Sequence, residues 1–152
     1  MRMTDETNSA TVPGRILAID FGARKVGLAV SDELGLTAQG LPTYYRSNKR
    51  ADFDHLRRVI RQYGVREIVL GHPLRMSGDV GIQAEKVQAF ADELRAKFKL
   101  PVHLFDERLT SVEANRVLRE TAMSIQRRAE IVDQLAAVLI LQSYMDFRKA
   151  SG

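Results

Sequence analysis

The sequence predicts an α/β domain built on a mixed five-stranded sheet, with three antiparallel strands, then two parallel strands, and flanking helices. Two observations predict this class. Short apolar runs rich in Ile and Val and bounded by Gly are typical of strands, whereas longer segments with apolar residues three or four apart are typical of helices. In chain order, three predicted strands come first and helices then alternate with strands, which favours a parallel arrangement of the later strands.

Length and composition predict one globular domain. The 152 residues are 45% hydrophobic and 28% charged, which is ordinary for a globular chain of one domain. We assign the polar residues 1–13 to a disordered N-terminal tail and residues 14–149 to the domain. The sequence has no Cys, which excludes disulfides and agrees with a cytoplasmic location. No apolar run approaches the ~20 residues of a membrane span, so no membrane partner is expected.

The first three predicted strands lie within residues 15–45. Two apolar runs, at residues 15–20 and 25–31, are separated by a glycine turn, and a third segment at residues 36–45 is less apolar. Pro42 has no N–H to donate, which predicts an edge position for the third strand. The connections between these strands are too short for parallel crossovers, so we expect an antiparallel meander.

The remaining predicted elements alternate between helix and strand. Ser47 and Asn48 precede a predicted helix at residues 50–63, and Gly64 ends it because glycine readily adopts the left-handed conformation of a helix C-cap. The other predicted elements are a strand at 67–70, a helix that ends near 99, a strand at 102–105, a helix that begins with a capping box at 110–113 and runs to about 120, and a last helix at 125–148.

The charge balance is mildly basic. The net charge is +4, the sequence pI is about 9.6, and Arg outnumbers Lys. The planar fork of Arg suits phosphate oxygens, although a GC-rich genome would produce the same bias. The composition therefore agrees with a nucleic-acid partner without establishing one.

Three acidic residues that are far apart in the sequence are expected to meet. Asp20 ends the first strand, and Glu107 follows the strand at 102–105, at the same sheet edge if the two strands are parallel. Asp133 begins the apolar part of the last helix, where a carboxylate is costly to bury unless donors or cations meet it. Taken singly, the three are also explained as a turn former, a surface partner of Arg108 and a residue favoured by the helix dipole.

Taken together, the three carboxylates predict a divalent metal site. Mg²⁺ and similar hard cations take oxygen ligands from carboxylates, water and substrate phosphates. Two such ions about 4 Å apart would activate a water and stabilise the leaving oxygen in phosphodiester hydrolysis. Without metal, three neighbouring carboxylates would repel one another. A nuclease that uses Mg²⁺ or Mn²⁺ is the simplest chemistry that needs such a cluster together with a basic surface.

Several short motifs resemble those of the YqgF/RuvX family, over roughly residues 15–147. The motifs lie at residues 18–22, 25–27, 31–32, 71–74, 83–85, 106–111 and 133–137. The resemblance implies an RNase H-like fold and a nuclease that processes the 5′ end of pre-16S ribosomal RNA, with a Holliday junction resolvase as the alternative. It also implies that the acidic residues of the family correspond to Asp20, Glu107 and Asp133.

Other charged residues near these positions are candidates for supporting roles. The candidates for nucleic-acid contact are Lys25, Arg24, Arg75, Arg108, Arg127 and Arg128. Arg108 could orient the substrate or hold the Glu107 carboxylate. Asp106 is an alternative ligand to Glu107 because successive strand residues point in opposite directions. Asp32, at the end of the neighbouring strand, is a candidate for positioning the metal ligands without binding the metal itself.

Two rival functions remain open at the level of sequence. The Asp20 segment also resembles the first phosphate motif of the actin and sugar-kinase ATPases, but those bind nucleotide between two domains and this chain has length for one. A non-catalytic RNA-binding module, with ribosomal particles as candidate partners, would tolerate loss of the acidic residues, yet all three are present. The sequence leaves a monomer and a homodimer equally open.

Overall fold

The computed structural model describes residues 14–110 and 125–151, and for residues 125–133 and 151 it describes the backbone only. Its elements are the strands β1 (Arg15–Phe21), β2 (Lys25–Ser31), β3 (Ala38–Tyr45), β4 (Val65–His72) and β5 (Val102–Asp106), the helices α2 (Lys49–Tyr63), α3 (Ile82–Phe98) and α5 (Ile125–Ser151), and the short 3₁₀ helix η1 (Glu107–Leu109). Within the described residues, no helix combines the length and apolar character needed to cross a bilayer.

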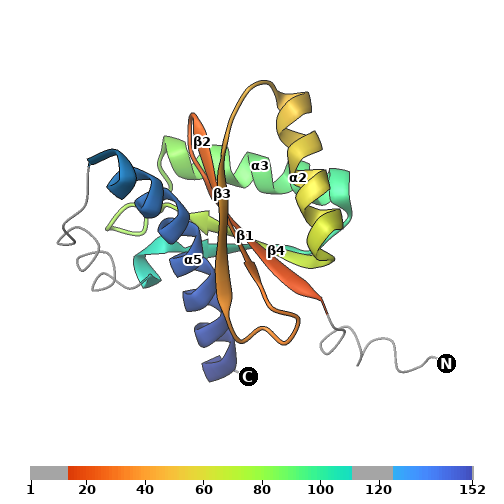
Figure 1. Ribbon diagram of the computed structural model, residues 1–152. Coiled ribbons are helices and arrows are strands. Elements are labelled where there is room, and N and C mark those ends of the chain that lie inside the picture. The colour runs from red at the N-terminus through yellow and green to blue at the C-terminus, as the bar shows by residue number, and fades with distance from the viewer. Residues whose placement is uncertain (1–13, 111–124, 152) are drawn as a thin grey trace.

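The five strands form one sheet in the order β3-β2-β1-β4-β5 (Figure 1). β1 pairs antiparallel with β2, and β2 pairs antiparallel with β3. β4 pairs parallel with β1, and β5 pairs parallel with β4. The predicted meander and the parallel direction of the later strands are both confirmed. β3 is an edge strand, as its proline predicts, and its register with β2 shifts between Val26 and Leu28.

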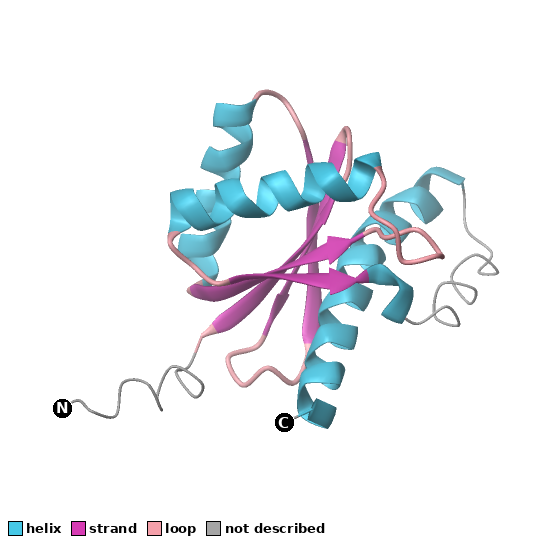
Figure 2. Ribbon diagram, turned by 180° about the vertical axis from the view of Figure 1, so that it is seen from behind, coloured by secondary structure: helices cyan, strands magenta, loops and turns pink. Residues whose placement is uncertain are grey.

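Helices cover both faces of the sheet, with α2 and α3 on one face and α5 on the other (Figure 2). Side chains along a strand alternate between the two faces, and β1 shows this directly. Leu17 and Ile19 pack with the α2 and α3 side, whereas Ile16 and Ala18 pack with the α5 side. β1 is therefore buried on both faces, which explains why its sequence is almost continuously apolar.

The ends of α2 match the local signals of the sequence. The Asn48 side chain accepts a hydrogen bond of 2.9 Å from the backbone N–H of Ala51. Gly64 ends the helix in the left-handed conformation, at φ 64°, and its N–H donates to the Ile60 carbonyl. Both predicted caps are confirmed.

The chain after β5 forms a short helix that the sequence did not indicate. Residues 107–109 form η1, and the Thr110 hydroxyl donates a 2.7 Å hydrogen bond to the Glu107 carbonyl. The rest of the predicted capping box, the helix to residue 120 and the tail at 1–13 lie outside the described residues.

A polar cluster anchors the C-terminal part of α5 to the sheet. The Tyr144 hydroxyl donates a 2.7 Å hydrogen bond to Glu67 in β4, and Arg148 donates to both Glu67 carboxylate oxygens at 2.8 Å. His103 in β5 lies 3.0 Å from the same carboxylate. Burial and the neighbouring Glu67 raise the pKa of Tyr144. Glu67 thus joins both parallel strands to α5.

Tyr144→Phe is expected to lower the free energy of unfolding by about 1 kcal/mol, because it removes one hydrogen bond to a charged acceptor. Thermal unfolding measures the effect. Tyr45→Phe, at an exposed tyrosine, is the matched control and should leave Tm unchanged. An equal Tm for the Tyr144→Phe variant and the wild type would contradict the anchoring role of this hydroxyl.

Candidate active site

The parallel strands β1, β4 and β5 bring their carboxyl ends to one edge of the sheet. Asp20 is the next-to-last residue of β1, His72 is the last residue of β4, and Asp106 is the last residue of β5. Glu107 follows directly as the first residue of η1. The strand directions therefore confirm that Asp20 and Glu107 emerge at the same edge, as we expected.

The Glu107 carboxylate lies against the backbone of β4 at Gly71. A Cβ atom at Gly71 would lie 3.1 Å from Glu107 Oε2 and 2.6 Å from Ile140 Cδ1 of α5. The missing side chain of Gly71 thus makes room for the carboxylate and for α5 at once. Burial, with smaller contributions from the Asp20 and Asp106 charges, raises the pKa of Glu107 from its ordinary value of 4.5 to about 7.

Asp106 has a different environment from its neighbour. Its carboxylate accepts hydrogen bonds from Arg108, the shortest at 2.6 Å from Nη2, and also from the Arg108 backbone N–H. The side-chain hydrogen bond from Arg108 is the main reason that the pKa of Asp106 is lowered. The interpretation that Arg108 holds the Glu107 carboxylate is wrong. The Arg108 side chain, which belongs to η1, pairs with the Asp106 carboxylate instead. Of the two adjacent acids, Glu107 is the one whose pKa is raised by partial burial and by the Asp20 charge.

The third predicted carboxylate can be placed only through its helix. Asp133 belongs to α5, but its side chain, like those of Arg127 and Arg128, lies outside the described residues. Tyr144 of α5 contacts Glu67 near the start of β4, whereas Ile140 contacts Gly71 near its end. The helix therefore runs antiparallel to β4, and position 133 comes two turns before Ile140, on the side of the carboxyl edge.

The described side chains contain no group of three or more His, Cys, Asp or Glu residues that could hold a metal ion. Because this statement does not include the Asp133 side chain, it concerns only part of the predicted set. Asp20 and Glu107 are the two predicted ligands whose side chains are described.

Asp32 does not belong to this site, and its predicted supporting role is wrong. β2 runs antiparallel to β1, so Asp20 pairs with Gly27 and the end of β2 lies at the opposite edge, roughly 16 Å away along the strands. Asp32 instead accepts hydrogen bonds from the N–H groups of Leu36 and Thr37, at 2.7 and 2.9 Å. Its function in the fold is to order the turn between β2 and β3.

The turn between β1 and β2 lies at the same edge as Asp20 and carries two of the predicted cations. Arg24 is exposed and Lys25 begins β2. A third cation, Arg46, was not predicted. Its Nη1 donates to the carbonyls of Gly22 and Ala23 at 2.9 and 3.2 Å. No local sequence signal distinguishes Arg46 from the other arginines, because its partners are more than 20 residues away.

The loop after β4 carries Arg75 and packs against η1. The Arg75 N–H donates to the Asp79 carbonyl at 3.0 Å, and Arg108 Nη1 donates to the Met76 carbonyl at 3.3 Å. The exposed Arg75 side chain lies against Gly81, where a Cβ would come within 2.8 Å of its Nε. Arg75 and Arg108 are therefore both at the carboxyl edge, with Arg108 occupied in joining Asp106 to this loop.

The topology and the acidic carboxyl edge define an RNase H-like α/β domain. Among solved structures, T. thermophilus RuvC in complex with a Holliday junction substrate matches 91% of this chain and 97% of that chain, with a TM-score of 0.53 and 17% sequence identity. This likeness shows the fold. The chain itself belongs to the RuvX family, whose model, described as a Holliday junction resolvase, matches residues 14–147.

Curated relatives are similar along nearly their whole length. A protein of Koribacter versatilis, named "Putative pre-16S rRNA nuclease", is 60% identical over 139 residues, which cover 91% of each chain. A protein of Moorella thermoacetica with the same name is 52% identical over 132 residues, which cover 87% of this chain and 94% of that one. The family and fold implied by the sequence motifs are thus confirmed.

Proposed function

We propose that this chain is a metal-dependent endonuclease that hydrolyses phosphodiester bonds at the 5′ end of pre-16S ribosomal RNA, through one domain at residues 14–149. Membership of the RuvX family and the names of the curated relatives support this function. Processing of a ribosomal RNA precursor makes ribosomal particles the expected partners and the cytoplasm the expected location.

The observation that carries the proposal is the half-buried Glu107 carboxyl group, whose pKa the Asp20 charge helps to raise. Burial and the Asp20 charge raise the pKa of Glu107 to about 7, so near neutral pH the fold holds a carboxylate that is costly to ionise. A protein keeps such a costly arrangement more readily when a cation offsets it. The oxygen-only donor set of Asp20 and Glu107 fits Mg²⁺ or Mn²⁺.

Asp20, Glu107 and Asp133 are the residues that would hold the metal, as one or two ions. When bound, divalent metal makes a water nucleophilic and stabilises the charge on the leaving oxygen. The Glu107 carboxyl must lose its proton before it can bind metal, so metal binding is favoured above pH 7. Arg24, Lys25 and Arg75 lie at the same edge, where they would attract the substrate phosphates.

A cleavage assay tests this function. We expect Asp20→Asn to slow cleavage of a pre-16S 5′-leader RNA in Mg²⁺ or Mn²⁺ by more than about 100-fold, because loss of an outer-shell partner of a metal alone can cost that much. Asp92→Asn is the matched control, since Asp92 is an exposed residue of α3, and it should cut like the wild type. Equal rates for Asp20→Asn and the wild type would contradict the carboxylate mechanism.

A Holliday junction is the second candidate substrate. The description of the family model and the DNA substrate of the T. thermophilus RuvC structure favour it. The same assay with a four-way DNA junction separates the two. Symmetric nicking of the junction without RNA cleavage, abolished by Asp20→Asn, would replace the ribosomal function with a resolvase function.

A further inference from the structure

A hollow of about 350 Å³ adjoins the carboxyl edge between the turn after β1 and helix α3. Phe21, which directly follows Asp20, forms part of its wall. The charged side chains that line it are Arg46 and Lys86, and among the described residues no carboxylate lines it. The hollow is therefore positively charged, and it lies at the carboxyl edge on the α2 and α3 side of the sheet, because Phe21 packs on that side.

Arg46 is held in one orientation at this hollow. Its Nη1 donates to the carbonyls of Gly22 and Ala23, its Nε donates to Asp52 at 3.4 Å, and its guanidinium lies 4.4 Å above the centre of the Phe21 ring. Nη2 makes no hydrogen bond to a described residue, and 32% of the side chain is exposed. A guanidinium that is already held in place, and whose Nη2 is still available as a donor, loses little side-chain entropy when it binds an anion.

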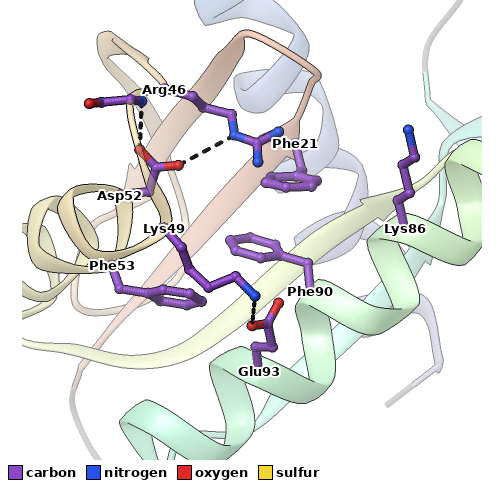
Figure 3. Close-up of a pocket in the computed structure, with 9 residues that line it drawn as sticks. Phe21, Arg46, Lys49, Asp52, Phe53, Lys86, Phe90 and Glu93 are labelled. Carbon is purple, nitrogen blue, oxygen red and sulfur yellow. Dashed lines mark hydrogen bonds and ion pairs between the residues drawn. The ribbon is translucent and has the colours of Figure 1, made fainter.

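The wall behind Arg46 is rigid as well. The Phe21 ring stacks on Phe90 of α3, with centroids 4.0 Å apart and ring planes 12° apart. The Gln83 side chain of α3 donates a 3.2 Å hydrogen bond to the Phe21 carbonyl. These contacts join the end of β1 to α3, with Arg46 and Lys86 on either side of Phe21 (Figure 3).

Two acidic residues line a smaller neighbouring hollow of about 130 Å³, and both are already paired. There Asp52 pairs with Arg46, and Glu93 pairs with Lys49 at 2.8 Å (Figure 3). Lys86 is exposed and forms no ion pair within the described part of the chain. An incoming anion would therefore find in Lys86 a cation that no described carboxylate neutralises.

We propose that Arg46 and Lys86 bind a backbone phosphate of the substrate strand, next to the bond that is cut. This inference rests on the proposed nuclease function and extends it to a second phosphate. The planar guanidinium supplies the geometry and the lysine supplies a mobile charge. The hollow lies at the same carboxyl edge as Asp20 but on the α2 and α3 side of the sheet. A strand bound at both places passes over the end of β1, and a phosphate contact of this kind is independent of base sequence.

Binding without cleavage tests the site. In EDTA, with fluorescence anisotropy of a labelled pre-16S 5′-leader RNA, Lys86→Gln should raise Kd about 3- to 10-fold and reduce the slope of log K against log salt by about 0.7, the value of one phosphate contact in a single strand. Lys97→Gln, an exposed lysine three turns further along α3, is the matched control and should change neither quantity. Arg46→Lys, which keeps the charge but loses the fork, should weaken binding with the slope retained.

A neutral methylphosphonate at single positions of the strand locates the contact. At one position next to the cut it should weaken wild-type binding by about the factor that Lys86→Gln costs, and it should have no effect on the Lys86→Gln variant. A four-way DNA junction should show the same loss, because both substrates offer the same backbone phosphate.

The outcomes separate this inference from the proposed function. If the wild type cuts RNA or junction and Lys86→Gln binds with the wild-type Kd and slope, the phosphate site is wrong and the nuclease stands. If the wild type cuts neither substrate but Lys86→Gln still reduces the slope, the phosphate site stands and the nuclease is wrong. Absence of binding by the wild type to both substrates overturns the phosphate site.

Discussion

Glu107→Gln is expected to abolish cleavage and, at pH 8 without metal, to make the folded protein more stable. The pKa of Glu107 is about 7 in the folded state against an ordinary value of 4.5. Below 4.5 the carboxyl is protonated in both states and costs nothing. As the pH rises from 4.5 to 7, the unfolded state loses this proton while the folded state keeps it, so the stability of the fold falls over this range and levels off above 7. Gln keeps the shape without the charge.

The measurement is thermal unfolding in EDTA at pH 5 and pH 8. At pH 8 we expect a gain of roughly 1–2 kcal/mol, less than the pKa shift alone would give because part of the side chain meets solvent. Near pH 5 the gain should largely vanish. Glu33→Gln, at an exposed position in the turn after β2, should show no such pH dependence. A Glu107→Gln variant that is less stable than the wild type at pH 8 would contradict the conclusion that the ionised Glu107 carboxylate destabilises the fold.

Gly71→Ala is expected to destabilise the fold and to inactivate the enzyme together. The added Cβ would come 2.6 Å from Ile140 Cδ1 and 3.1 Å from Glu107 Oε2, so that α5 and the carboxylate must both shift. Overpacking of a core costs about 1–3 kcal/mol, which thermal unfolding will show as a lower Tm. The displaced carboxylate should reduce cleavage by about 100-fold.

A second substitution separates the two effects. Ile140→Val removes the Cδ1 atom that the new methyl group would strike, so the Gly71→Ala, Ile140→Val double variant should recover most of the lost stability. The contact with Glu107 remains, and cleavage should stay low. Recovery of stability and activity together would mean that the glycine serves only the packing of α5.

Most of the fold follows from local signals in the sequence. Asn48 and Gly64 mark the two ends of α2. The Asn48 side chain caps a backbone N–H of the first turn, and Gly64, which has no side chain, adopts the left-handed conformation that ends the helix. Strand directions follow from the length of the connections, and these directions place Asp20 and Glu107 at one edge. Neither inference requires knowledge of distant contacts.

The predictions are wrong where the position of a side chain depends on strand direction or on contacts that local sequence does not reveal. Asp32 ends an apolar strand just as Asp20 does, yet the antiparallel direction of β2 carries it to the other edge. Of the two roles open to Arg108, the contact with its sequence neighbour Glu107 is not formed, because Arg108 pairs with Asp106 at the start of η1. Arg46 contacts a turn more than 20 residues earlier, and nothing near it in the sequence predicts that.

The edge strand β3 has a consequence for how two copies of the protein would associate. Pro42 removes one donor from the strand, and the shift in register between Val26 and Leu28 of the partner strand breaks the regular ladder nearby. An incoming strand would meet an interrupted row of hydrogen-bonding groups, which opposes extension of the sheet from one molecule into the next. At this edge the protein is protected against aggregation, and a dimer would not be built by pairing β3 of one copy with a strand of the next.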